Sequence, residues 1–160
     1  MPDYYLERCL KRLAILARGA RDQEALDRLA SVADVNASAN RAVAMLLRER
    51  VAPGQPVFVW GFEPVIYDLA DRPPASRYLY NVPQRSAWAR EKTREQLMRD
   101  LEHRPPAAIV VEHNDVFPMV TGDTIDSARA LEGFSELRQL IEERYTRTAQ
   151  IEDFDIYLAR

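Results

Sequence analysis

The chain has 160 residues, of which 47% are hydrophobic and 29% are charged, and its formal net charge at pH 7 is -3. This balance is typical of one globular domain and excludes a disordered or fibrous chain. It also disfavours nucleic acid as a partner, because acidic residues interrupt the cluster of basic residues between Arg85 and Arg99.

Cysteine content and hydropathy further limit the classes of protein to which the chain can belong. Cys9 is the only cysteine, so no intrachain disulfide can form. The longest apolar run, from Ala42 to Leu47, is far shorter than the roughly 20 residues that cross a bilayer. No signal-peptide pattern opens the chain, and we expect it to be soluble as given.

The first 35 residues predict helices. From Asp3 to Ala20, apolar residues recur at three- and four-residue steps between charged ones, which indicates an amphipathic helix. A second, shorter helix is expected from about residue 22 to residue 32. We interpret residues 1–35 as a helical N-terminal extension of a single α/β domain whose sheet-containing core spans residues 36–160.

The core begins with a helix and a strand. Asn36 or Ser38 can cap a helix that the sequence Ala52-Pro53-Gly54 ends. The next segment, Val57 to Trp60, is apolar at every position and rich in β-branched and aromatic residues. Such a run favours a strand that is covered on both faces, as in a parallel sheet.

The middle of the chain predicts alternating helices and strands. Glu63-Pro64 begins a short helix, Pro73-Pro74 ends it, and a second strand is expected over residues 76–80. A long charged helix then runs from about Ser86 to His103. Ala108 to Val111 repeats the pattern of a buried strand.

The end of the chain predicts a loop, a helix and a hairpin. The loop runs from His113 to about Ser127, and the helix contains Leu131, Phe134, Leu137 and Ile141. Two segments of alternating polarity, residues 145–151 and 154–158, predict an antiparallel hairpin at one edge of the sheet. We therefore expect a three-layer α/β fold with a mixed sheet of about five strands, parallel in its core and flanked by helices.

The polar sequence Glu112-His113-Asn114-Asp115 directly follows the third predicted strand. Ligands of open parallel sheets usually bind at this carboxyl edge, so these residues are candidates for a metal or acid–base site. Adjacent side chains cannot all point into one coordination sphere, and a solvated loop is the competing interpretation. Asp123 and Asp126 can join such a site only if their loop folds back.

Other sites find little support in the sequence. Only Gly61 follows the first strand, so a glycine-rich dinucleotide fingerprint is missing, and Glu63 would repel a phosphate. No Gly-x-Ser-x-Gly elbow occurs, and Cys9 lies on the apolar stripe of a helix, where a thiol is usually inert. We predict no cofactor, no metal and no catalytic residue.

Part of the sequence resembles a known family. The resemblance lies in residues 53–61 (Pro-Gly-Gln-Pro-Val-Phe-Val-Trp-Gly), in Ile66-Tyr67, in Arg72 and in residues 74–78 (Pro-Ala-Ser-Arg-Tyr), and it extends to residues 105–111 and 154–157. The segment is similar to the soluble C-terminal region of bacterial membrane glycosyltransferases related to the dolichyl-phosphate-mannose protein mannosyltransferases. Residues 1–35 and 113–130 match no part of that pattern.

The resemblance implies an accessory role. Members of that family use a polyprenyl-phosphate sugar as donor, and their catalytic acid lies in the membrane part. This chain would then be a non-catalytic domain at the extracytoplasmic face of the bacterial inner membrane. Its partners would be the membrane part of the parent transferase and the polyprenyl-phosphate sugar or the acceptor.

The residues Tyr67, Arg72, Arg77 and Tyr78 are the candidates for ligand binding, as a pocket for an anionic group such as a lipid-linked phosphate. For Arg77, the competing interpretation is a buried structural ion pair with Glu63, Asp68 or Asp71.

Two other functions remain open at this point. One is a free-standing small α/β enzyme with its site near Glu112 to Asp115, which requires a concave pocket there. The other is a scaffold module that binds a protein through the first amphipathic helix or through the last strand.

Overall fold

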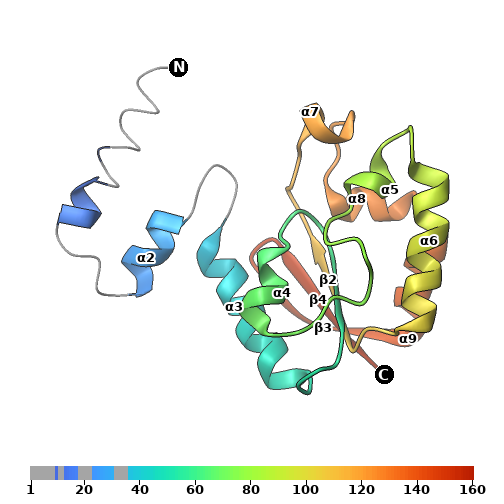
Figure 1. The fold of residues 1–160 in the computed structure, drawn as a ribbon, viewed down its shortest axis with the longest axis horizontal. Helices are drawn as coiled ribbons and strands as arrows, with labels where there is room; N and C mark the ends of the chain where they lie inside the picture. The colour runs from blue at the N-terminus through green and yellow to red at the C-terminus, as the bar shows by residue number, and fades with distance from the viewer. Residues whose placement is uncertain (1–9, 11–12, 18–22, 31–35) are drawn as a thin grey trace. The chain divides into compact units, whose positions relative to one another are not determined.

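A computed structural model of the chain describes residue 10 and residues 13–17, 23–30 and 36–160. The chain divides into two compact units, residues 1–38 and residues 39–160. The sheet lies entirely in the second unit (Figure 1).

The described part of the first unit is helical. Residues 13–17 form helical turns, and α2 (Gln23–Ala30) follows. Leu10, Leu13 and Leu16, from the predicted apolar stripe, are exposed. Cys9, from the same stripe, lies outside the described residues.

The second unit alternates helices and strands as the sequence predicts. Its elements in chain order are α3 (Ala37–Arg50), β1 (Val57–Trp60), α4 (Val65–Ala70), α5 (Val82–Arg85), α6 (Arg90–His103), β2 (Ala108–Glu112), α7 (Pro118–Thr121), α8 (Ser127–Glu132), α9 (Ser135–Arg144), β3 (Tyr145–Ile151) and β4 (Phe154–Ala159). None of the helices in the described residues is long and apolar enough to cross a membrane.

The sheet has four strands in the order β1-β2-β4-β3. The two buried runs form the parallel pair, with Val57 opposite Ala108 and Trp60 opposite Val111. β4 pairs antiparallel with both β2 and β3, so the predicted hairpin is confirmed and β3 is its outer strand. A β-bulge between Arg147 and Ala149 interrupts the outer strand, a device that protects exposed edges from pairing.

The expectation of a strand at residues 76–80, and with it a five-stranded sheet, is wrong. An isolated bridge joins Pro74, just before these residues, to Val57. The backbone of Ala75 donates to Val57 O at 2.8 Å, and the chain then leaves β1. The side chain of Asp100, on α6, accepts hydrogen bonds from Ser76 Oγ and Arg77 N, and these contacts hold the segment in an irregular conformation.

Helices flank the sheet, and alternate residues of β1 point to different hydrophobic clusters. Val57 and Val59 belong to a cluster with residues of α3 and α4. Phe58 and Trp60 belong to a second cluster with residues of α6, α8 and α9. Both faces of the strand are therefore buried, which explains why its sequence does not alternate in polarity.

The segment predicted as a loop, residues 113–127, contains the short helix α7. Asp126 caps the next helix by accepting a hydrogen bond from Arg129 N at 2.8 Å. The single helix predicted around residues 131–141 is in fact two, α8 and α9, which meet at Gly133 and Phe134.

Candidate functional site

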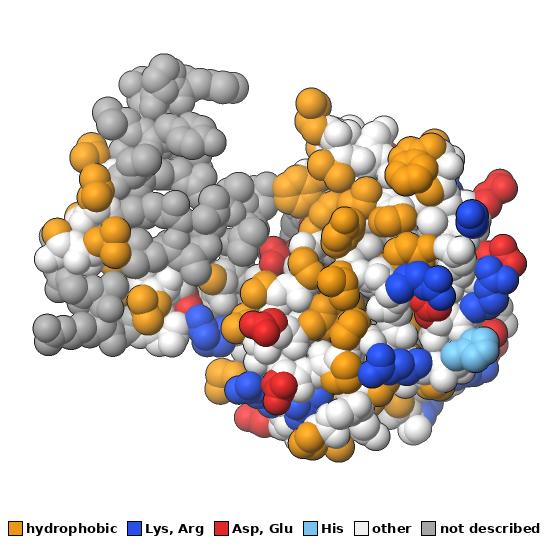
Figure 2. All heavy atoms as spheres, in the orientation of Figure 1, with side chains coloured by type: hydrophobic (Ala, Val, Ile, Leu, Met, Phe, Trp, Pro, Cys, Tyr) orange, Lys and Arg blue, Asp and Glu red, His pale blue; other side chains and the backbone are white. Residues whose placement is uncertain are grey.

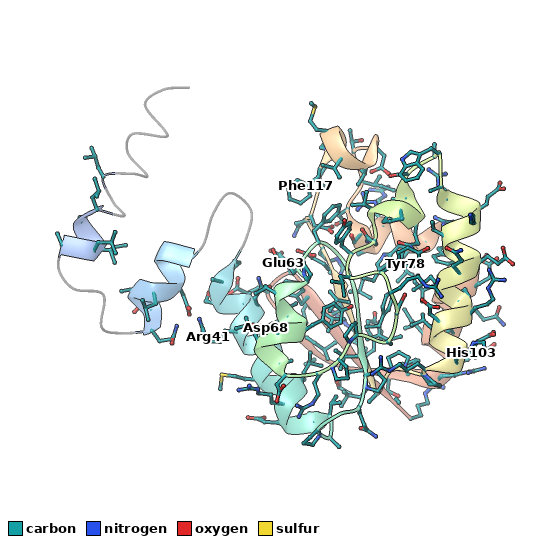
Figure 3. All side chains as sticks on the ribbon, in the orientation of Figure 1. Arg41, Glu63, Asp68, Tyr78, His103 and Phe117 are labelled. Carbon is teal, nitrogen blue, oxygen red and sulfur yellow. The ribbon has the colours of Figure 1, made fainter. Side chains whose placement is uncertain are left out.

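Three buried carboxylates lie at the carboxyl end of the parallel strand pair, and we call Glu63, Glu112 and Asp115 the carboxylate cluster. Glu63 follows β1, whereas Glu112 ends β2 and Asp115 follows it. Parallel strands bring their carboxyl ends to one edge of a sheet, so residues distant in sequence meet here. Glu63 and Phe117 both lie toward this end (Figure 3).

Glu112 lies directly against the end of β1. Its Oε2 accepts a hydrogen bond from Phe62 N at 2.6 Å. Burial, and to a smaller extent repulsion from Asp115, raises the pKa of Glu112 to about 8 against the opposing effect of that hydrogen bond. At neutral pH the Glu112 side chain is therefore mostly protonated.

Asp115 is held by the first turn of α8. Its Oδ1 accepts from Ser127 N at 2.6 Å, and its Oδ2 accepts from Ser127 Oγ. Burial raises the pKa of Asp115 to about 6, although the Ser127 hydrogen bonds favour the ionised form. The Asp115 side chain thus has a defined position, and its pKa lies near neutral pH.

Glu63 receives its hydrogen bond from α3. Asn40 Nδ2 donates to Glu63 Oε2 at 2.7 Å, and both side chains are buried. Burial raises the pKa of Glu63, and the charge on Asp115 adds to the rise.

Ser127 is also bound from the other side, by α5 and the residue before it. Asn81 Nδ2 and Arg85 Nη1 both donate to Ser127 Oγ, at 2.6 Å and 3.2 Å. Arg85 Nη2 pairs with Asp123 Oδ1 at 2.9 Å, and the guanidinium lies 5.6 Å from the centre of the Phe62 ring. The loop of Asp123 therefore does fold back toward the site.

Several buried polar side-chain atoms have no hydrogen-bond partner in the described chain. These atoms are Asn40 Oδ1, Asn81 Oδ1, Gln84 Oε1 and Arg85 Nε. Among the described residues, no group of three or more His, Cys, Asp and Glu side chains is arranged to hold a metal ion.

The other polar residues of this loop serve local contacts. His113 Nε2 lies 3.1 Å from Asp155 Oδ2, on β4, and Asp155 also pairs with Arg147. Asp126 accepts from Asn114 N at 2.9 Å in addition to capping α8.

Of the four candidate ligand-binding residues, Tyr67 and Arg72 lie together around α4. The Tyr67 hydroxyl accepts from Val59 N at 2.9 Å, and burial raises its pKa. The Arg72 guanidinium is buried and donates to the carbonyl oxygens of residues at the ends of α3 and α4, namely Arg48, Val51, Ala70 and Asp71. Both residues border an open depression of about 390 Å³.

Arg77 and Tyr78 lie against α6 instead. Arg77 forms a two-point ion pair with Asp100, at 2.9 Å and 2.8 Å, and the Tyr78 hydroxyl donates to Gln96. The hydrogen bond from Arg77 is the main reason that the pKa of Asp100 falls to about 2. The expectation that Arg77 is buried and paired with Glu63, Asp68 or Asp71 is wrong, because its side chain is exposed and its partner is on α6. Anion binding by the four residues stays a prediction.

We expect Arg72→Lys to destabilise the protein. Lysine keeps the charge but cannot place two nitrogens on carbonyls of two helices at once, so several buried carbonyl oxygens lose their donors. The expected loss is about 2 kcal/mol in the free energy of unfolding, measured by urea denaturation. Arg138→Lys, at an exposed position on α9, is the matched control, and equal stability of the two variants would contradict the prediction.

Sequence reasoning missed Asn40, Asn81, Arg85 and Ser127 as site residues. Each looks ordinary in the sequence, where Asn40 lies in a helix and Arg85 in a charged segment. Their common site is revealed only by contacts between distant residues. Asn81 and Arg85 reach Ser127 across 46 and 42 residues of sequence.

No protein-family model, curated protein or solved structure matches this chain.

Proposed function

We propose that this chain is a non-catalytic, extracytoplasmic accessory domain of a bacterial membrane glycosyltransferase that uses a polyprenyl-phosphate sugar. Its partner is the membrane part of that enzyme, which it contacts through the end of the second unit that carries α7. The observation that carries the proposal is the exposed apolar surface at that end.

This apolar end lies at the carboxyl edge of β1 and β2. Met119 is 98% exposed and Trp88 is 84% exposed, with other exposed apolar side chains at Val65, Val116 and Val120. Figure 2 shows apolar side chains gathered around α7 at the top of the view. Large exposed apolar patches usually mark a surface that contacts a protein or a membrane.

The residues of the family resemblance support the same role. The motif includes Gly61, Tyr67 and Arg72, which connect structural elements. The Tyr67 hydroxyl and the Arg72 guanidinium both form hydrogen bonds with backbone groups. A motif built of such residues maintains a scaffold. As part of this proposal, the second unit has three layers: α3 and α4 cover one face of the sheet, and α6 and α9 cover the other.

An independent active site has less support. Both oxygens of Asp115 are bound by Ser127, whose own hydroxyl is fully buried. We therefore expect that the purified chain transfers no sugar from a polyprenyl-phosphate donor. Turnover that disappears with Glu112→Ala or Asp115→Ala would contradict the accessory role.

Site-specific crosslinking tests the docking surface. A photoreactive amino acid is incorporated in place of Met119 in the cell that produces the chain. In the control, it is incorporated in place of Gln139, which is exposed on α9. We expect position 119 alone to crosslink to a multi-span transferase, identified by mass spectrometry. Sugar transfer by that enzyme should fall about tenfold with Met119→Asp, which places a charge in the interface.

The proposal fails if position 119 crosslinks only to proteins without membrane spans, or if both positions label the same partners equally. It also fails if Met119→Asp leaves transfer by the crosslinked enzyme unchanged.

A further inference from the structure

The carboxylate cluster brings three acidic side chains together without a basic partner of their own among the described residues. None of the three carboxylates forms an ion pair in the described chain. Repulsion from Asp115, Glu63 and Asp153 acts on Glu112. The charge of the nearby Arg85 opposes the rise in the pKa of Asp115, but the hydrogen bonds of its guanidinium go to Ser127, Asp123 and the carbonyl of Ile125.

Two buried amides provide independent evidence that points to a ligand. Asn40 and Asn81 are each at most 2% exposed; Asn40 Nδ2 donates to Glu63 of the cluster, and Asn81 Nδ2 donates to Ser127, which in turn binds Asp115. The Oδ1 of each amide has no donor in the described residues. A buried acceptor without a donor costs about 1–3 kcal/mol, so a ligand that supplies donors would be favoured.

The surroundings favour a planar or compact organic cation. Glu63 and Glu112 each keep 7% of their surface exposed, so the cluster is in contact with solvent. The Phe62 and Phe117 rings, 4.9 Å apart, lie at the same end, and aromatic faces attract cations. The cluster does not have the geometry of a metal site.

We propose that the carboxylate cluster binds an organic cation that carries a guanidinium or primary ammonium group. The cation provides several N–H donors, which suit carboxylate oxygens and the free amide oxygens alike. Its charge offsets the repulsion among the acids. The site is independent of the accessory role proposed above, because it requires only contacts within the second unit.

The test uses n-butylguanidinium as the probe and n-butylurea as a neutral probe of the same shape, with binding measured by calorimetry. We expect saturable binding of the cation and at least tenfold weaker binding of the urea. Because the pKa of Glu112 is about 8, binding at pH 7 should release protons, and the affinity should rise as the pH approaches 8. Calorimetry in buffers of different ionisation enthalpy measures that release.

The variants separate this site from nonspecific attraction. Glu112→Gln imitates the protonated side chain, so it should fold normally and bind the cation at least tenfold more weakly. Glu102→Gln, at an exposed position on α6, should bind as the native chain does. Equal binding by the Glu112→Gln variant, equal binding of the urea, or the same heat from Mg²⁺ at equal ionic strength would overturn the proposal.

A small amine and a basic side chain of the membrane partner offer the same group. A second arm separates these sources by introducing Glu112→Gln into the chain that carries the photoreactive residue at position 119. A fall in crosslinking assigns the cation to the partner, and unchanged crosslinking assigns it to a small amine. Both assignments require that calorimetry shows binding of the cation. If it shows none, the proposed cation site is overturned, while the proposed docking surface is unaffected.

Discussion

Replacing Glu112 by glutamine is expected to stabilise the protein at pH 8.5 and to leave its stability almost unchanged at pH 4.5. The pKa of this side chain rises from an ordinary value of 4.5 to about 8 in the folded chain. Between these values the folded chain holds a proton that the unfolded chain has lost. Stability of the native protein therefore falls as the pH rises through this range.

The size of the effect follows from the width of the shift. One pKa unit corresponds to about 1.4 kcal/mol, so the shift from 4.5 to about 8 should give the variant a gain on the order of 4 to 5 kcal/mol over the native protein by pH 8.5. Urea denaturation at each pH from 4.5 to 9 measures the difference. The control Glu102→Gln, at an exposed position, should show the same dependence of unfolding free energy on pH as the native protein. The same result for Glu112→Gln would contradict the prediction, because it would mean that Glu112 is ionised at neutral pH.

Replacing Gly61 by alanine is expected to be among the most damaging single changes in this chain. A Cβ at position 61 would lie 2.2 Å from Glu112 Oε2 and 2.6 Å from Glu112 Cβ. The second contact cannot be relieved by turning the Glu112 side chain, because Cβ is fixed by the backbone of β2. The ends of β1 and β2 must therefore separate.

The expected loss is about 3 kcal/mol or more in the free energy of unfolding. Gly133→Ala is the matched control, since its added Cβ would meet no atom closer than 3.6 Å. Gly61 is not among the glycines with a positive φ, so backbone strain would not explain a large effect. Equal unfolding free energies for the two alanine variants would show that Glu112 does not press on Gly61.

Local sequence patterns predicted most of the regular elements of the second unit. The apolar runs at Val57 and Ala108 became the parallel pair, and the alternating segments at the end became the hairpin. These elements follow from residue spacing because each buries a face that its own pattern defines. Residues 76–80 failed this test, since their aromatic content suggested a strand while hydrogen bonds to Asp100 decided their path.

The sequence predicted where the polar residues of the candidate site lie but could not predict which other residues join them. The position of Glu112 and Asp115 at and after the end of a buried strand was enough to place them at the carboxyl edge of the sheet. Their burial and their raised pKa values come from segments that topology brings to them. No spacing rule connects Asn40 with Glu63 or Asn81 with Ser127, because side-chain hydrogen bonds across a fold have no period in the sequence.

By itself, the sequence determined the alternation of helices and strands, the two strands buried on both faces and the glycine that follows the first of them. These features are local, because the period of apolar residues and the conformational limits of proline and glycine act over a few neighbours. Only the tertiary structure decided that the sheet has four strands, that Arg77 pairs with Asp100 and that three acids meet in a desolvated cluster. Desolvation and long-range hydrogen bonding depend on the packing of the whole unit, and that packing exists only once the chain has folded.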